Sequence, residues 1–192
     1  GIVMNLNLGC GNKILEGYTN VDKYDYYNCD VVHDLETFPY PFEDNSVDSI
    51  LLCHVLEHIG QDPKIFNNIL TELYRICKPE ALINIIVPHP RHDDFISDPT
   101  HVRPITVLGL SLYDKEQNEI WQSSGAANTP LGLILGIDFK IENVQYQVED
   151  EIMKKYNSKE LTKEELEHLM KHHNNVIKQT TIKWRVKKSS VN

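Results

Sequence analysis

The sequence predicts an α/β fold built on a mostly parallel, doubly wound sheet, and two observations carry this prediction. Short apolar runs of strand length alternate with segments of helical periodicity along the first half of the chain. Near the carboxyl end, two longer runs alternate apolar and polar residues, which is typical of an antiparallel pair with one solvent-facing side. Alternating strands and helices imply parallel strands with helices on both faces of the sheet.

The first half of the chain is expected to supply five buried strands. We place them at residues 2–8, 18–22, 31–32, 47–53 and 81–87. The helix before the last of these covers residues 66–77, whose apolar residues recur at helical spacing, and Pro79 stops it. Only ten residues separate Gly11 from Asp22, so the helix of the first crossover is expected to be stunted.

The second half is expected to close the sheet. A helix is predicted over residues 105–113, followed by a glycine-rich stretch that reaches Gly136. Thr162 and Glu165 have the spacing of a capping box, so a helix is expected from there through His173. We place the closing antiparallel pair at residues 139–148 and 180–187.

Length and composition fit one domain over residues 1–192, long enough for one core and too short for two. Within it we expect a substrate-side loop and helix region at residues 88–136 and a helical insertion at residues 150–175 before the last strand. No apolar stretch approaches the ~20 residues that span a bilayer, and no secretory signal pattern opens the sequence. We therefore expect a soluble, cytoplasmic protein.

Charge and cysteine usage narrow the expected partners. The net charge of −9 disfavours a surface that follows a nucleic-acid backbone. The four cysteines stand apart, which suits a reducing compartment and excludes a zinc ribbon or a disulfide framework. The basic residues near the carboxyl end alternate as on a solvated strand face: Lys183, Arg185, Lys187 and Lys188. A small-molecule partner is expected, nucleic acid and membrane are not, and the oligomeric state stays open.

A nucleoside-binding pattern follows the first two expected strands. Gly9 and Gly11 end the first strand, and glycines allow a tight turn and close approach of a ligand. Asp22 ends the second strand, where a carboxylate can accept hydrogen bonds from ribose hydroxyls. A dinucleotide site would also need a third glycine where the chain has Ile14. The pattern therefore favours a nucleoside without a pyrophosphate.

Six short motifs extend this pattern in order along the chain. They are LNLGCG at 6–11, NVD at 20–22, HDL at 33–35, PYPFEDNSVDSI at 39–50, CHVLEHI at 53–59 and LYRICKP at 73–79. Together they resemble the class I S-adenosylmethionine-dependent methyltransferases, most of all the small type 11 branch, over residues 3–104. The resemblance implies a Rossmann-like sheet in the order 3-2-1-4-5-7-6 with strand 7 antiparallel. It also implies S-adenosylmethionine as the cofactor and S-adenosylhomocysteine as the product.

The resemblance also implies roles for single residues. Gly9 and Gly11 would approach the methionine part of the cofactor, and Asp22 would hold the ribose. Asp34 and Leu35 would meet the adenine. The full expected cofactor-binding set is Leu8, Gly9, Cys10, Gly11, Asn12, Asp22, Lys23, Asp34, Leu35, Cys53 and His54. The chain departs from the family in its short first crossover and in having Glu80-Ala81 where the family has two glycines.

The string His54-Val-Leu-Glu57-His58 also matches a metalloprotease pattern in which two histidines one helical turn apart hold zinc. That pattern needs a long helix, whereas here the string follows a buried strand directly, so a protease is disfavoured. In the preferred interpretation His54 faces the cofactor, and Glu57 and His58 lie near the substrate entrance. The alternative for His58 is a packed or capping histidine.

Residues 88–104 are rich in titratable groups and leave the carboxyl end of the fifth strand, where open α/β sheets bind ligands. The candidate catalytic residues are His89, His92, Asp93, His101 and, from the preceding motif, His58. Arg91 and Arg103 are the candidate substrate-binding residues, for a carboxylate or phosphate. Two alternatives remain: Asp98, His101 and Arg103 could pair to hold the loop, and His89, His92 and Asp93 could bind a metal. No metal is expected.

Methyl transfer to an oxygen or nitrogen of a small molecule, such as a sugar or another metabolite, is the expected function. Sequence signatures used for amino groups of bases and for carbon-5 of cytosine are missing, while RNA and protein acceptors stay open. One alternative is another reaction of the same cofactor, a lyase reaction or aminopropyl transfer. The other is a non-catalytic cofactor-binding partner subunit.

Overall fold

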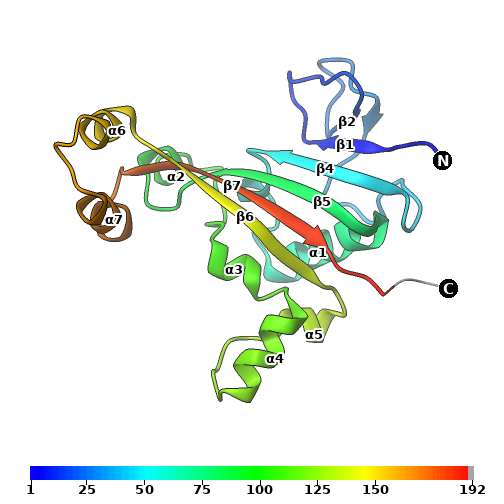
Figure 1. Ribbon diagram of the computed structural model, residues 1–192. Helices are drawn as coiled ribbons and strands as arrows, with labels where there is room; N and C mark the ends of the chain where they lie inside the picture. Colours follow the sequence, from blue (N-terminus) through cyan, green and yellow to red (C-terminus); the bar gives the residue numbers. More distant parts are fainter. Residues whose placement is uncertain (190–192) are drawn as a thin grey trace.

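The computed structural model describes residues 1–189 and contains one seven-stranded sheet in the order β3-β2-β1-β4-β5-β7-β6 (Figure 1). Strands β1 to β5 pair in parallel, and β7 runs antiparallel between β5 and β6. The strands are β1 (Asn5–Leu8), β2 (Thr19–Asp22), β3 (Val31–Val32), β4 (Val47–Cys53), β5 (Cys77–Pro88), β6 (Phe139–Val148) and β7 (Ile177–Val186). The predicted strand order and the antiparallel β7 are confirmed.

The main core lies on one face of this sheet. Cross-strand partners Ile83 and Trp184 are both fully buried, and Trp184 stacks on Phe139 with ring centroids 3.9 Å apart. Helix α1 (Pro63–Ile76) covers this face with Leu70 and Leu73, which helical spacing places on one side of the helix. The apolar residues whose spacing predicted the helix are therefore the residues that pack it against the sheet.

The remaining helices are short. They are η1 (Leu56–His58), α2 (Asp93–Ile96), α3 (Val107–Ser111), α4 (Lys115–Ser123), α5 (Leu131–Leu135), α6 (Asp150–Asn157) and α7 (Lys163–His172). Helix α7 starts with the predicted capping box of Thr162 and Glu165. Helices α4 and α5 lie in the glycine-rich stretch before Gly136, where no particular helix was predicted; Asp114 caps the first, and Gly136 ends the second in a left-handed conformation.

The first crossover also differs from the expectation. Residues 10–18 form turns rather than a stunted helix, with Lys13 N donating to the Cys10 carbonyl oxygen. In the described residues the connections β2–β3 and β3–β4 contain no helix either. The sheet face opposite α1 is therefore partly exposed at Leu51, Leu82 and Ile86, and the expected helices on both faces are corrected here.

Several strand ends differ by a few residues. Strand β1 starts at Asn5 instead of residue 2, because Ile2 and Val3 are exposed and reach no partner strand. Strand β5 continues back to Cys77, and β7 starts at Ile177 rather than residue 180. Among the described residues, no helix combines the length and the apolar character that crossing a membrane requires.

Helices α6 and α7 lie beyond one end of the sheet, where the β6–β7 ribbon extends past the other strands (Figure 1). They have a small core of their own around Val148, Leu166 and Val176. This pair sits beside the segment that leaves β5, because Asn175 N donates to the Arg91 carbonyl oxygen.

Candidate functional site

A pocket opens where β1, β2 and β4 end, at the edge of the sheet on which open α/β folds bind ligands. Its lining residues are Gly9, Asp22, Lys23, His33, Asp34, Leu35, His54, Val55, His58 and Ile59. The set comes from four separate segments of the chain, which the parallel pairing of the strands brings together.

The turn after β1 needs glycine at position 9. Gly9 has φ +66°, and an added Cβ would lie 2.6 Å from Cγ2 of Val55, too close for any real contact. Cys10 N donates to the Val21 carbonyl oxygen at 3.0 Å, which fixes the turn against β2. The backbone after β1 therefore passes directly against Val55, and both residues form the floor of the pocket.

Acidic side chains gather at the ends of β2 and β3. His33 N donates to the Asp22 carbonyl oxygen at 2.8 Å, which places residues 33–35 beside Asp22. Lys23 Nζ lies 3.6 Å from the Asp34 carboxylate, and this carboxylate raises the pKa of the Lys23 ammonium. The Asp22 side chain lines the pocket beside this ion pair.

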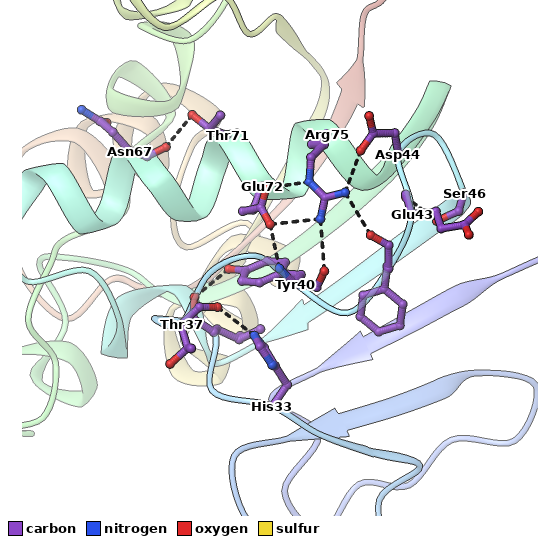
Figure 2. Close-up of polar contacts among 12 residues, drawn as sticks. His33, Thr37, Tyr40, Glu43, Asp44, Ser46, Asn67, Thr71, Glu72 and Arg75 are labelled. Carbon is purple, nitrogen blue, oxygen red and sulfur yellow. Dashed lines mark hydrogen bonds and ion pairs between the residues drawn. The ribbon is translucent and has the colours of Figure 1, made fainter.

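The segment that carries Asp34 and Leu35 is held by α1. Tyr40 Oη donates to the Leu35 carbonyl oxygen at 2.8 Å, and Tyr40 N donates to the Glu72 carboxylate at 2.7 Å (Figure 2). Arg75 bonds the same carboxylate through Nε and donates to the Tyr40 carbonyl oxygen through Nη2. A coil without a helix of its own is thereby kept in one position at the edge of the pocket.

A second, polar pocket shares His54 and His58 with the first and continues toward the ends of β5 and β7. It is lined by His54, Glu57, His58, Pro88, Asp94, His101, Lys178 and Gln179. His54 has φ +56°, an uncommon backbone conformation for a non-glycine residue, and one Nε2 contact of 3.0 Å with Gln179 fixes its ring. The Glu57 carboxylate, 3.6 Å from Nδ1, raises the pKa of His54.

Six of the expected cofactor-binding residues line the first pocket: Gly9, Asp22, Lys23, Asp34, Leu35 and His54. The other five lie outside its lining: Leu8, Cys10, Gly11, Asn12 and Cys53. Leu8 and Cys10 are buried, and burial raises the pKa of the Cys10 thiol to about 11. Sequence reasoning missed His33, Val55 and Ile59, although all three lie inside the motifs HDL and CHVLEHI.

The expected catalytic residues separate into two pairs and one residue, His89, that belongs to neither. His58 and His101 come together, with ring centroids 4.6 Å apart, and both line the polar pocket. His92 is buried, caps α2 through Nδ1 and contacts the Glu149 carboxylate at 2.6 Å through Nε2. Asp93 lies beside it in a separate hollow against α6. His89 accepts from Arg91 N through Nδ1 and packs against Tyr146, and it lines neither pocket.

Both expected substrate-binding arginines make contacts within the protein. Arg91 donates to the carbonyl oxygens of Met170 and Lys171 at the end of α7. Arg103 stacks on Phe66 and donates to the Gly60 carbonyl oxygen at 2.7 Å. Neither side chain lines either of the two pockets at the strand ends.

The loop-holding alternative is met in part, since His101 Nε2 lies 3.6 Å from the Asp98 carboxylate while Arg103 reaches elsewhere. A metal site from His89, His92 and Asp93 is not assembled. Among the described residues, the group whose ligand atoms lie close enough together to hold an ion is Glu57, His58 and His101.

Comparison with known proteins agrees with the fold. Residues 13–85 match the family model described as a methyltransferase domain. No curated protein sequence matches the chain.

Solved structures with the same fold cover nearly the whole chain. An S-adenosylmethionine-dependent methyltransferase from Archaeoglobus fulgidus is 18% identical, with a TM-score of 0.58 over 96% of this chain and 86% of that one. The [4+2]-cyclase SpnF is 13% identical, with a TM-score of 0.51 over 98% of this chain and 76% of that one. A chain in the complex between the Haloferax volcanii Trm112 methyltransferase activator and a methyltransferase is 14% identical, with a TM-score of 0.52 over 97% of this chain and 83% of that one. The strand order, the match over residues 13–85 and these structures identify the fold as that of the class I S-adenosylmethionine-dependent methyltransferases.

Proposed function

We propose that this protein binds S-adenosylmethionine in the pocket at the ends of β1, β2 and β4 and transfers its methyl group to an oxygen or nitrogen of a small polar molecule. The observation that carries the proposal is the convergence of Gly9, Asp22, Asp34 and His54 on one pocket. Each of them comes from a different motif of the family resemblance.

The chemistry of this pocket suits a sulfonium nucleoside. The Asp22 carboxylate can accept hydrogen bonds from both ribose hydroxyls, and Asp34 and Leu35 offer acceptors and an apolar surface to the adenine. The Gly9 turn presents backbone close to the amino-acid part of the donor. No pyrophosphate is present in such a ligand, which agrees with a turn in place of a helix after β1.

The polar pocket that shares His54 and His58 is the proposed acceptor site. Its lining combines Lys178 and Asp94 with three histidines, which favours a small acceptor with several polar groups. During transfer the bond from sulfur to the methyl carbon breaks as the bond to the acceptor atom forms, and sulfur leaves as a neutral thioether. The acceptor proton needs a base, and His58 and His101 are the candidates that lie in this pocket.

The contacts of the other candidate residues favour supporting roles. His92, Asp93 and Arg91 connect the segment after β5 to α6 and α7, and Arg103 supports the turn at Gly60. We infer that these residues shape the acceptor side without touching the acceptor.

The fold alone leaves the reaction open, because SpnF has the same fold and is described as a cyclase. Product analysis separates the possibilities. Methyl transfer releases S-adenosylhomocysteine, aminopropyl transfer releases methylthioadenosine, and a binding-only subunit releases neither.

The binding half of the proposal is tested by calorimetric titration with S-adenosylmethionine and S-adenosylhomocysteine. Asp22→Ala is expected to weaken both by at least about tenfold, since a hydrogen bond to a charged group contributes roughly 1.5–3 kcal/mol. Asp25→Ala is the matched control, because Asp25 is exposed on the β2–β3 loop outside the pocket lining. If the unaltered protein binds neither compound, or if both variants bind equally well, the proposed donor site is wrong.

A further inference from the structure

Glu57 is an unusual buried carboxylate. Glu57 is 1% exposed and lines the polar pocket from η1. Among the described residues, neither of its carboxylate oxygens has a hydrogen-bond partner. Burial of a carboxylate without a donor or a cation is costly, so such a group in a folded protein calls for a missing positive partner.

Two histidines that face Glu57 have their Nδ1 atoms already in use. His101 Nδ1 lies 2.8 Å from the Phe95 carbonyl oxygen, which can only accept, so this nitrogen carries the proton. His58 Nδ1 lies 3.2 Å from the Thr100 carbonyl oxygen and 3.1 Å from its hydroxyl oxygen. That hydroxyl donates its own proton to Asp98 at 2.6 Å, so it too can only accept from His58.

In the neutral form both rings therefore keep a lone pair on Nε2 and have no proton to offer Glu57. One ligand atom from each of Glu57, His58 and His101 lies within 4.8 Å of the other two. Metal-binding histidines commonly donate their other ring N–H to a backbone carbonyl in this way, which fixes the tautomer and aims the free nitrogen at the ion.

We propose that Glu57, His58 and His101 form a binding site for a divalent first-row transition metal ion, with its open coordination positions toward the polar pocket. Two imidazole nitrogens and one carboxylate suit Zn²⁺, Mn²⁺, Fe²⁺ or Co²⁺ better than Mg²⁺ or Ca²⁺, which prefer oxygen ligands. Three protein ligands leave room for water or a substrate oxygen.

This inference deepens the proposed function, on which its mechanistic consequence rests. An ion at this position would bind the hydroxyl oxygen of an acceptor in the polar pocket and lower its pKa, so the acceptor proton would pass to water and His58 and His101 would act as ligands instead of bases. The acceptor class then becomes alcohols or phenols. His54 and His58 line both pockets, so the ion site would lie beside the proposed donor site.

The rival partner for the carboxylate is His54 in its protonated form, with Nδ1 3.6 Å from Glu57. That distance is longer than a hydrogen bond, and His54 is half-exposed while Glu57 is buried. If His54 is the only partner, the protein will bind no ion at Glu57.

The test is a calorimetric titration of tag-free, chelator-treated protein with ZnCl₂ and with MnCl₂. We expect the protein to bind one of these ions, and we expect Glu57→Gln and His101→Asn each to weaken this binding by at least about 100-fold, because loss of a group that only supports a ligand already costs up to about that much. The matched control is the triple variant His168→Ala, His172→Ala, His173→Ala, because these histidines cluster at the end of α7 and could bind an ion adventitiously. The control is expected to keep this binding.

Thermal unfolding gives a second readout that does not depend on methyl transfer. Without metal, Glu57→Gln is expected to melt no lower than the unaltered protein, because it removes an unpaired buried charge. With metal, the unaltered protein and the triple histidine control gain stability, and Glu57→Gln does not. Loss of binding in the α7 variant alone, or no binding by the chelator-treated protein, overturns the inference. Donor binding by that same metal-free protein is measured separately, so either proposal can fail without the other.

Discussion

At the scale of single residues, the pocket at the ends of β1, β2 and β4, the proposed donor pocket, depends on how closely the backbone at Gly9 approaches Val55. The position combines a left-handed φ of +66° with a gap into which no Cβ fits. Gly11, two residues later, has a similar φ of +53° and open space around an added Cβ. A comparison of the two positions therefore separates the cost of backbone strain from the cost of steric overlap.

Gly9→Ala is expected to lower the free energy of unfolding by roughly 1–3 kcal/mol more than Gly11→Ala, because only the first adds overlap to strain. Urea unfolding of both variants measures the difference. In a Val55→Ala background the cost of Gly9→Ala should shrink, since the overlapping methyl group is gone. Equal costs for the two glycine variants would show that Val55 does not limit position 9.

Sequence reasoning worked best for residues whose role is fixed by the backbone. Gly9 and Asp22 end adjacent parallel strands, and strand pairing alone brings them together. Arg91 and His92 could not be placed in the same way, because their partners at the end of α7 and the start of α6 lie 79 and 57 residues further along the chain. Side-chain partners at such separations have no local signature.

At the scale of elements, the coil between β3 and β4 contains no helix and is held in place by hydrogen bonds to α1. Glu72 and Arg75, one turn apart on α1, bond Tyr40 from the coil, and Arg75 also bonds Asp44 (Figure 2). The motif PYPFEDNSVDSI is one of those that carry the family resemblance. Its sequence alone does not predict that α1 supplies its hydrogen bonds. This contact is what keeps Asp34 and Leu35 at the pocket.

Glu72→Gln is expected to lower the free energy of unfolding by about 1.5–3 kcal/mol near pH 7, because charge-assisted hydrogen bonds to Arg75 and Tyr40 are weakened. The Arg75 guanidinium lowers the pKa of Glu72 in the folded protein. A lowered folded pKa gives stability that is present above the unfolded pKa and is lost as pH falls through the folded one.

The difference between Glu72→Gln and the unaltered protein should therefore shrink in urea unfolding as the pH approaches about 3, well below the unfolded pKa of a glutamate. Glu43→Gln is the control, because Glu43 lies exposed on the same coil and only its backbone oxygen bonds Ser46. A difference that stays constant with pH would mean that Glu72 acts through packing rather than charge.

Helices shorter than about two turns were the elements that the sequence predicted least well. Helix α5 has five residues, too few for an apolar period to stand out from a glycine-rich background. Helix α1, with fourteen residues and a continuous apolar stripe, was predicted to within three residues at its start and one at its end. Length and burial decide how much of an element the sequence reveals.

At the scale of the whole molecule, the two halves of the sheet are supported differently. Strands β4, β5 and β7 carry α1 and the main core on one face, whereas β2 and β3 are short and joined by turns and coil. The family resemblance predicted the strand order correctly, whereas the alternation of strands and helices predicted only a mostly parallel sheet. The alternation could not predict the bare crossovers, since a short connection is compatible with either a turn or a small helix.

This asymmetry predicts a gradient in amide hydrogen exchange. In the free protein, amides of β5 and β7 should exchange most slowly, because they open only with the core, and amides of β2 and β3 faster. Excess S-adenosylmethionine should slow exchange in three separate segments that line the donor pocket, around Gly9, Asp34 and Val55. Amides of α6 and α7 serve as the internal control, because those helices lie beyond the sheet end and outside the pocket lining (Figure 1). Mass-spectrometric exchange with and without S-adenosylmethionine measures the strands, the pocket segments and the control helices in one experiment. A uniform slowing across the chain would mean that the ligand stabilises the protein globally rather than through this pocket.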